Sequence, residues 1–372
     1  MKQPKICISP LDWGLGHATR CIPLLLALQQ LGYDIYIASE RHHEVILKEA
    51  VPTAHFLTLR GYRVHYSKKR GLFFVSMFLQ APKILFSMLY EYGWLYKKAK
   101  QYNFDLIISD NRLGFFHKKI KSVFITHQLN LQTPFLWTTR FFQILQYAVI
   151  KNYSACWIPD IEGDNSLAGI LSNPEIKPKM PLWYMGCLSR LHHTLNIAST
   201  DKGVSILSAS APPIQFIGIV SGPEPQRSLL EDILWEEGVE LNISFVIVAG
   251  KPLNINYNKS AAKGKLYHHL PGNELAAQIE RADYIICRGG YTSLMELIPF
   301  QKKLILIPTP GQTEQEYLAK RWQEKKWAIY FNQADFSLHT ALAKAANFKF
   351  ISPPFLEMQE QELKMNLKKL SL

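Results

Sequence analysis

The chain has 372 residues, of which 48% are hydrophobic and 19% are charged. This composition excludes a chain that is disordered throughout, because disorder requires low hydrophobicity together with high charge. The 42 lysine and arginine residues outnumber the 30 acidic residues, which leaves a formal net charge of +12. The charge favours an anionic partner such as a nucleotide, a nucleic acid or a membrane surface. At roughly 150 residues per domain, the length predicts two domains.

The five cysteines are odd in number, widely spaced and without a Cys-x-x-Cys pattern. This pattern predicts neither a disulfide framework nor a zinc site and favours a reducing compartment. The first apolar run is too short for the core of a signal peptide. No stretch of about 18 apolar residues is available to span a membrane. We therefore predict a cytoplasmic protein, with the inner face of the membrane as a place where it could bind.

Short apolar runs rich in β-branched residues alternate with longer stretches of helical periodicity along the chain. This alternation predicts an α/β protein with parallel sheets and crossover helices. The first series of expected strands comprises Lys5–Ser9, Asp34–Ala38, Ala54–Leu59, Asp105–Ser109, Val123–Thr126 and Ala155–Ile158. The second series comprises Gln215–Val220, Ser244–Val248, Lys265–His268, Tyr284–Cys287 and Leu304–Ile307.

An irregular stretch with several prolines, Glu162–Pro213, separates the two series and predicts a junction between two doubly wound domains. A single large sheet is the weaker alternative, because open sheets rarely exceed about ten strands. We expect one Rossmann-like domain over residues 1–185 and a second over residues 186–350. The remaining residues 351–372, with a helix over Phe355–Leu370, could pack back on the first domain. In such sheets ligands bind beyond the carboxyl ends of the strands, so the loops there should carry the chemistry.

The loop after the first strand contains Gly14, Gly16 and His17 and leads into an apolar helix. The glycines permit a tight turn and leave room for a ligand. His17 then lies at the helix entrance, either as a packed or solvated histidine or as a functional group. A dinucleotide-binding fingerprint is a weak alternative, since Thr19 stands where its third glycine belongs, although Glu40 could supply its acidic residue.

The strand Tyr284–Cys287 is followed by Arg288, Gly289 and Gly290 and then by a helix expected to begin at Thr292 or Ser293. The N–H groups at a helix start suit a phosphate, and an arginine adds a fixed positive charge beside it. This loop is therefore the main candidate for binding a diphosphate.

Glu296 allows two interpretations. Ser293 and Glu296 have the spacing of a capping box, in which both side chains satisfy donors at the helix end. A carboxylate at this position could instead accept hydrogen bonds from the two hydroxyls of a ribose.

Two further loops follow strands. Gln312 and Gln315 lie beyond Leu304–Ile307, and their amides suit sugar hydroxyls, which need donors and acceptors. The alternative is a solvated loop before a capped helix. Ser221, Gly222 and Arg227 lie beyond Gln215–Val220. Arg227 could meet a phosphate there, although a surface arginine is the commoner role.

These passages resemble the GT-B glycosyltransferases, and most closely the family 28 group that includes the peptidoglycan N-acetylglucosaminyltransferase. The resemblance rests on Gly14 to His17, on Ala282 to Glu296 and on Ile307 to Gln315. It implies two Rossmann-like domains facing across a cleft, with a nucleotide-sugar donor mainly on the C-terminal domain. The stretch between Lys303 and Gln315 lacks the family's usual histidine, so the identity of the donor sugar is not implied. Much of the N-terminal domain differs from the peptidoglycan enzyme, so that acceptor is not implied either.

The resemblance also implies roles for single residues. Glu296 would hold the ribose hydroxyls, Gln312 and Gln315 would touch the donor sugar, and His17 would lie near the reacting centre. Residues 289–293 would face the diphosphate, and residues 270–273 would lie against the uracil. The expected donor-binding set is Gly14, Gly16, Ser221, Gly222, Arg227, Leu270, Gly272, Arg288, Gly289, Gly290, Tyr291, Thr292, Ser293, Glu296, Gln312 and Gln315.

The predicted reaction is inverting transfer of a hexose or N-acetylhexosamine from a UDP-sugar to a hydroxyl acceptor. His17 is the expected base, since a reference pKa of roughly 6.5 allows a neutral imidazole. Asp110 would orient His17 or act as the base itself, unless it is a helix cap or turn residue. Arg288 and Arg227 would stabilise the departing diphosphate. No Asp-x-Asp motif follows a strand, so we predict no metal and no cofactor besides the donor substrate.

The aromatic stretch 68–98 has basic flanks, which is typical of an interfacial helix, and a second aromatic stretch covers Phe135–Phe142. A buried helical pair under the first sheet is the commoner explanation. The expected partners are the nucleotide-sugar donor, a hydroxyl acceptor that a lipid could carry, and an anionic membrane surface. Nucleic acid is not expected, because the basic residues are scattered and no recognised module is visible. A nucleotide-sugar 2-epimerase, a non-catalytic nucleotide-sugar binding protein and a nicotinamide dehydrogenase are the alternative functions.

Overall fold

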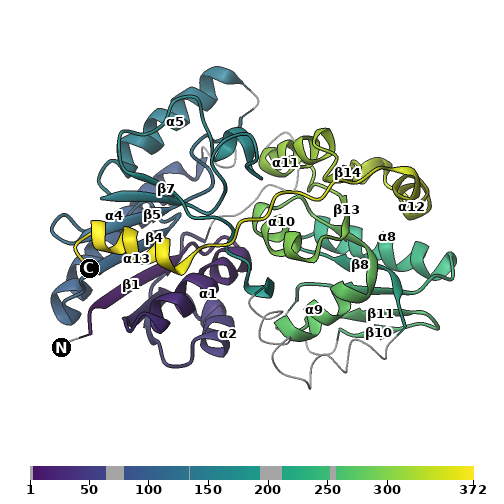
Figure 1. Ribbon diagram of the computed structural model, residues 1–372, viewed down its shortest axis with the longest axis horizontal. Coiled ribbons are helices and arrows are strands. Elements are labelled where there is room, and N and C mark those ends of the chain that lie inside the picture. Colours follow the sequence, from purple (N-terminus) through teal and green to yellow (C-terminus); the bar gives the residue numbers. More distant parts are fainter. Residues whose placement is uncertain (1–2, 64–78, 134, 193–211, 252–256) are drawn as a thin grey trace. The chain divides into compact units, whose positions relative to one another are not determined.

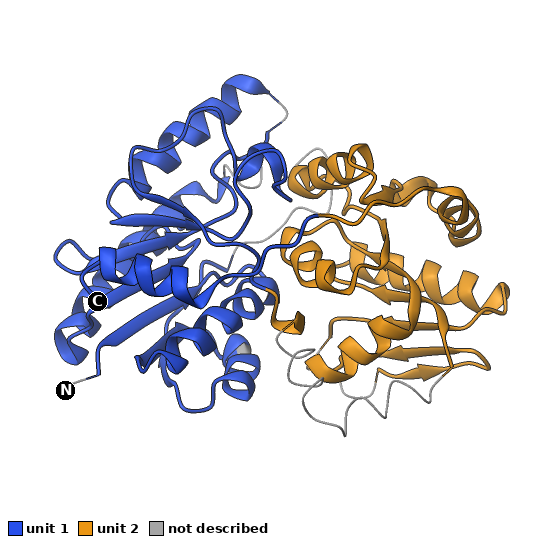
Figure 2. Cartoon of the chain, viewed as in Figure 1, with its two compact units in different colours: residues 1–65, 74–188, 354–372 blue, residues 66–73, 189–353 orange. Residues whose placement is uncertain are grey.

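The computed structural model describes residues 3–63, 79–133, 135–192, 212–251 and 257–372. The chain forms two compact units (Figure 2). The first contains residues 1–65, 74–188 and 354–372, and the second contains residues 66–73 and 189–353. Each unit is built on one sheet with helices packed around it (Figure 1). The predicted class, α/β with two parallel-dominated sheets, is confirmed.

In the described residues, the sheet of the first unit has seven strands in the order β3-β2-β1-β4-β5-β6-β7, and all the pairs between them are parallel. The order reverses between β1 and β4, which makes this position the topological switch point where open α/β sheets bind ligands. The strands are β1 Lys5–Pro10, β2 Asp34–Ser39, β3 His55–Thr58, β4 Leu106–Asp110, β5 Lys121–Ile125, β6 Ala155–Ile158 and β7 Leu182–Tyr184.

The sheet of the second unit also has seven strands, in the order β10-β11-β9-β8-β12-β13-β14. Among the described strands of this sheet, only the edge pair β10–β11 is antiparallel. The switch point lies between β8 and β12. The strands are β8 Ile214–Ile219, β9 Phe245–Val248, β10 Lys259–Ser260, β11 Gly264–Tyr267, β12 Ala282–Cys287, β13 Lys303–Leu306 and β14 Ala328–Tyr330.

Most of the helices connect successive strands, as a parallel sheet requires, and α12 and α13 follow the last strand. In the first unit they are α1 Leu15–Gln30, α2 Arg41–Ala50, α4 Ala81–Tyr102, α5 Leu136–Ile150, the 3-10 turn η2 Gly169–Leu171 and the C-terminal α13 Glu360–Lys369. In the second unit they are α8 Gln226–Glu240, α9 Gly272–Arg281, α10 Tyr291–Leu297, η3 Ile298–Phe300, α11 Thr313–Glu324, η4 Gln333–Asp335 and α12 Leu338–Asn347.

The structure differs from the sequence predictions mainly in its shortest elements. β7, β10 and β14 have three, two and three residues, too few to produce a recognisable period. The expected junction Glu162–Pro213 is too long, because residues up to Leu188 belong to the first unit and include β7. The C-terminal helix begins at Glu360, five residues later than predicted. Before it, the Cys187 N–H donates to the Leu356 carbonyl at 2.6 Å, which joins the C-terminal segment to the first unit.

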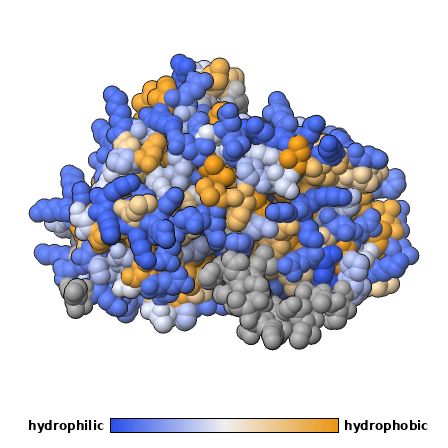
Figure 3. All heavy atoms as spheres, viewed as in Figure 1, coloured by the Kyte–Doolittle hydropathy of each residue, from blue (hydrophilic) through white to orange (hydrophobic). Residues whose placement is uncertain are grey.

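Large apolar side chains are exposed on two helices of the first unit, and some lie over α5 on the face shown in Figure 3. On α4, Leu85, Phe86 and Leu89 are 60–71% exposed. The α5 apolar face, 47–85% exposed, comprises Phe135, Leu136, Trp137, Phe141, Ile144 and Leu145. The expectation of a buried helical pair is therefore wrong for these residues, while residues 68–78 of the first stretch lie outside the described residues. In the described part of the chain, no helix has the length and apolar character to cross a membrane.

Candidate active site

The switch point of the first unit brings His17 to Asp110. Pro10 and Asp110 are partners in the register of β1 and β4, so the loop after β1 starts beside this carboxylate. Gly14 has a φ of 89° and is the N-cap of α1, as its predicted turn requires. Gly16 lies inside α1 instead of in the turn. His17 is on the first turn of the helix, with its Nδ1 2.9 Å from Asp110 Oδ2.

Arg20, one turn further along α1, binds the same carboxylate. Its Nε donates to Asp110 Oδ1 at 3.0 Å, and its Nη2 also donates to that oxygen. Its Nη1 lies 3.1 Å from Nδ1 of His127, which follows β5. Arg20 and Asp110 are at most 1% exposed. Arg20 and His127 were not among the predicted site residues, although an arginine within an apolar helix must find a buried acceptor.

Two opposing effects act on the pKa of Asp110. Burial alone raises it, but the charge of Arg20 and the contact with His17 outweigh burial and lower the pKa to about 2. For His17, burial and then the Arg20 charge lower the pKa below its usual value, against the opposing effect of Asp110. An ionised carboxylate only accepts hydrogen bonds, so Nδ1 of His17 carries the proton and Nε2 the basic lone pair. The geometry therefore favours Asp110 as the group that orients His17. It does not favour Asp110 as the base or as a helix cap.

The switch point of the second unit brings together two predicted glycine loops. Ile219 of β8 and Cys287 of β12 are partners in register, so the loops after these strands begin side by side. Gly222 has a φ of 103° in the first loop. In the second, a Cβ on Gly289 would lie 3.0 Å from the Gln315 carbonyl oxygen, so a side chain would force this loop away from α11. The paired loops leave backbone groups at the edge where a phosphate is expected.

The two arginines predicted to face the diphosphate are held by protein groups. Arg288 is 1% exposed, and its Nη1 donates to the Ile307 carbonyl at 3.0 Å and to Gln333 Oε1 at 2.6 Å. Burial lowers its pKa to about 10. Arg227 donates through Nη2 to Glu224 Oε1 at 2.7 Å. Arg288 thus stabilises these loops by hydrogen bonds from inside the unit. This position differs from the predicted one beside a ligand.

The capping box is not formed. α10 begins at Tyr291, slightly earlier than predicted, with Gly290 as N-cap and no hydrogen bond from a capping side chain. Ser293 is therefore inside the helix, and Glu296 bonds elsewhere. Its Oε1 accepts a hydrogen bond from Arg190 Nε at 3.1 Å. Arg190 comes directly after residue 189, where the chain enters the second unit, and was not among the predicted site residues.

The predicted glutamines lie close together beyond β13. Gln315 Oε1 accepts a hydrogen bond from the Thr309 N–H at 2.8 Å, and its Nε2 donates to Gln312 Oε1. These bonds hold both amides near the glycine loop after β12. Leu270 is 5% exposed and precedes α9, which starts at Gly272 after β11. All these donor-binding candidates therefore follow strands of one sheet, while Gly14 and Gly16 belong to the first unit.

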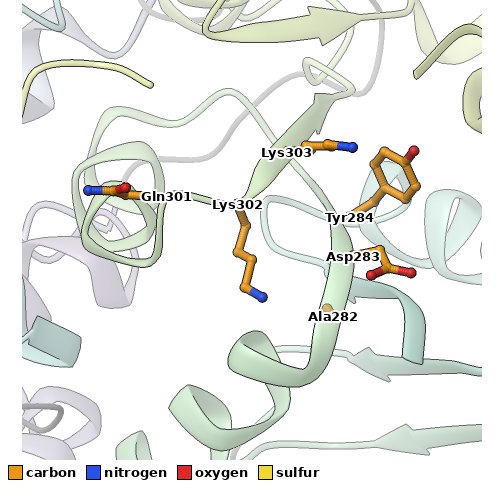
Figure 4. A pocket seen from close by; sticks show the side chains of 6 residues that line it. All are labelled: Ala282, Asp283, Tyr284, Gln301, Lys302 and Lys303. Atoms are coloured by element: carbon orange, nitrogen blue, oxygen red, sulfur yellow. The ribbon is translucent and has the colours of Figure 1, made fainter. Parts of the chain in front are cut away.

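A pocket of about 350 Å³ lies elsewhere on the second unit (Figure 4). Its lining consists of Ala282, Asp283, Tyr284, Gln301, Lys302 and Lys303. These residues lie at the amino ends of β12 and β13, at the opposite edge from the glycine loops, so we do not assign the donor to this pocket. Among the described residues, no group of three or more His, Cys, Asp or Glu side chains is arranged to hold a metal. Metal independence stays a prediction.

The two sheets and the loops at their switch points define the fold of a GT-B glycosyltransferase. Residues 227–369 match the model of the glycosyltransferase family 28 C-terminal domain. The resemblance inferred from the sequence is thereby confirmed.

Comparisons over the whole chain agree with this fold. An uncharacterized glycosyltransferase of Methanosarcina mazei is 20% identical over 342 residues, which cover 84% of this chain and 81% of that protein. MurG of Acinetobacter baumannii has a TM-score of 0.57 at 14% identity, covering 99% of this chain and all of its own. SnogD, a glycosyltransferase of Streptomyces nogalater, has a TM-score of 0.59 at 14% identity, with 100% of both chains covered. The rhamnosyltransferase SpnG in complex with thymidine diphosphate has a TM-score of 0.61 at 13% identity, with 92% and 90% covered.

Proposed function

We propose that this chain is an inverting, metal-independent glycosyltransferase that moves a hexose or N-acetylhexosamine from a UDP-sugar to a hydroxyl acceptor. The observation that carries the proposal is the His17–Asp110 hydrogen bond of 2.9 Å at the switch point of the first unit. It provides an oriented imidazole whose pKa is lowered, so the neutral base is the dominant form near pH 7.

The reaction needs a base for the acceptor and a binding site for the departing diphosphate. Nε2 of His17 takes the hydroxyl proton as the acceptor oxygen forms its bond to the anomeric carbon. The bond from that carbon to the diphosphate oxygen breaks on the opposite side, and its electron pair leaves with UDP. Asp110 stays ionised and stabilises the imidazolium that forms. The loops after β8 and β12 supply backbone donors for the diphosphate, an interaction worth a few kcal/mol per donor.

A panel of nucleotide sugars tests the donor assignment. A UDP-sugar should raise the melting temperature, because a ligand that binds the native state stabilises it by mass action. With the best donor, Glu296→Ala should raise the Michaelis constant by about tenfold, since it removes hydrogen bonds to a charged group. An unchanged Michaelis constant together with early melting would assign Glu296 a purely structural role.

Incubation with the UDP-sugar and no acceptor separates this function from its closest rival. A transferase should leave the sugar configuration unchanged, whereas a 2-epimerase would release the epimer. A calorimetric UDP signal with no turnover on any acceptor would favour a non-catalytic binding protein.

We also propose that the acceptor is carried by a lipid and that the α5 apolar face binds an anionic membrane surface. Six exposed apolar residues lie on this face, and Arg140 is the only charged residue of α5. On α4 the only acidic residue, Glu91, is buried and paired with Arg112. Aromatic side chains without exposed acidic neighbours are typical of an interfacial helix, and the net charge of +12 adds attraction to anionic lipid.

The protein should therefore sediment with anionic vesicles at low salt and less at high salt. The double variant Trp137→Ser/Phe141→Ser should lower the partition coefficient roughly 100-fold or more, because each side chain contributes about 1.5–3 kcal/mol when it is buried. Both residues are more than half exposed, so the fold should survive. Leu229→Ser on α8, 47% exposed in the second unit, is the matched control. Protein that stays in the supernatant at low salt would end this part of the proposal.

A further inference from the structure

A second arginine, Arg112, is buried at the switch point of the first unit. It comes two residues after Asp110 and is 0% exposed. Its N–H donates to Ser109 Oγ at 3.1 Å, and its carbonyl oxygen accepts hydrogen bonds from Ser109 Oγ at 2.6 Å and from Tyr153 Oη at 2.7 Å. The backbone of Arg112 is thus fixed at the end of β4, and its side chain starts from a fixed point.

The guanidinium of Arg112 joins the end of β1 to α4. Its Nε donates to the Pro10 carbonyl at 2.8 Å, and its Nη1 donates to Glu91 Oε1. Its Nη2 lies 3.9 Å from Asp12 Oδ1, close enough for attraction between the charges. The Glu91 side chain is 1% exposed, and its Oε2 accepts the Tyr62 hydroxyl at 2.7 Å. Solvent therefore cannot replace these partners.

These contacts hold the start of the loop that leads to His17. Pro10 and Asp110 are partners in register, and the Leu11 N–H donates to the Asp110 carbonyl at 3.0 Å. The bond from Arg112 Nε to the Pro10 carbonyl is a further connection between the same two segments, and it is made by a side chain. The hydrogen bond of 2.9 Å between His17 and Asp110 depends on the relative position of these segments. In an active site a misplacement of about 1 Å can cost roughly 100-fold in rate.

Stability alone does not account for this ion pair. The loss of hydration offsets most of the attraction between two buried charges, and apolar side chains of similar volume are often equally stable. What an apolar pair lacks is the directed hydrogen bond from Nε to the end of β1. Glu91 provides the buried guanidinium with its counter-charge, and the guanidinium in turn holds β1.

We propose that Arg112 is a positioning residue for the His17–Asp110 pair. Glu91 is the anion that keeps the guanidinium at the end of β1. The inference rests on the proposed function, because it takes His17 to be the base. It adds a requirement to that function, since Nδ1–H stays on Asp110 only while residues 10–14 keep their place. Without this contact the imidazole would exchange between its two neutral tautomers, and Nε2 would lose part of its basic form.

¹⁵N nuclear magnetic resonance of the full chain with labelled histidine tests this assignment without any substrate. The signals of His17 are those missing from His17→Ala, and in the unaltered chain they should show a protonated Nδ1 and an unprotonated Nε2. In Arg112→Met/Glu91→Gln, which removes both charges of the pair, the two signals should move toward each other as both tautomers become populated. The rate of UDP release with saturating substrates should fall roughly 10- to 100-fold, while the Michaelis constant of the donor stays within about twofold.

Two further variants keep the readout specific. Arg112→Lys keeps the charge without the planar donor group and should give an intermediate change. Arg281→Met is the matched control in the second unit, because that arginine also donates through Nε to a proline carbonyl, at 3.0 Å, and it should leave the His17 signals and the rate unchanged.

Unchanged His17 signals in the double variant would overturn the inference, even if the protein melts earlier or reacts more slowly. In that case Arg112 would have a purely structural role or would contact the acceptor directly. If the unaltered chain releases no UDP from any nucleotide sugar, the proposed function fails, and the His17 signals still decide the role of Arg112.

Discussion

Replacing His17 with alanine is expected to lower turnover by roughly 100-fold or more, the usual scale for loss of a general base. The imidazole is 15% exposed and is oriented by Asp110, so the change removes the basic nitrogen while it leaves the Arg20–Asp110 pair in place. The measurement is the initial rate of UDP release with donor and acceptor saturating. His55→Ala is the control, because that side chain is 56% exposed on β3, away from the switch point.

The pH profile provides an independent check of the same residue. The base acts in its neutral form, which is lost as the pH falls through the pKa of His17. Because burial and Arg20 lower that pKa, the acid limb of kcat/KM should lie below the usual histidine value of about 6.5. Near-normal turnover of His17→Ala, or an acid limb above that value, would contradict the assignment.

Replacing Arg20 with methionine is expected to lower the free energy of unfolding by about 3–5 kcal/mol, because it leaves the carboxylate of Asp110 buried without its cation. Arg20 and Asp110 are 1% and 0% exposed, so solvent cannot replace the lost partner. In calorimetry of the full chain, the melting temperature of the first unit should fall by roughly 10 °C. Arg140→Met, at an exposed position of α5, is the matched control.

A second variant separates the ion pair from simple packing. Arg20→Met/Asp110→Leu removes both charges and should recover most of the stability, since replacing a whole buried pair by apolar groups is often neutral. Turnover should nevertheless stay low, because His17 has lost the group that orients it. If Arg20→Met alone melted at the temperature of the unaltered chain, Asp110 would not depend on this cation.

Much of the fold could be predicted because its signals are local. Strand β6 has the bounds expected from its apolar run, and Gly14 adopts the positive φ that a turn after β1 demands. Glycine loops that follow strands at the switch points indicated both halves of the candidate site. The predicted start of α10 was less accurate. Ser293 and Glu296 have the spacing of a capping box, but the helix already begins at Tyr291. Local spacing alone could not distinguish a cap from a carboxylate paired with a distant arginine.

The amino-acid order is enough to specify where strands end and where glycine permits a tight turn, since these features depend on a few neighbouring residues. It does not specify which distant side chains meet. His17 and Asp110 are 93 residues apart, and Arg190 and Glu296 are 106 apart. Strand order and register bring such groups together. The orientation of the Arg288 side chain is likewise decided by the tertiary structure. A guanidinium can bond equally well to a phosphate or to a carbonyl, and here the loop at Ile307 provides the carbonyl.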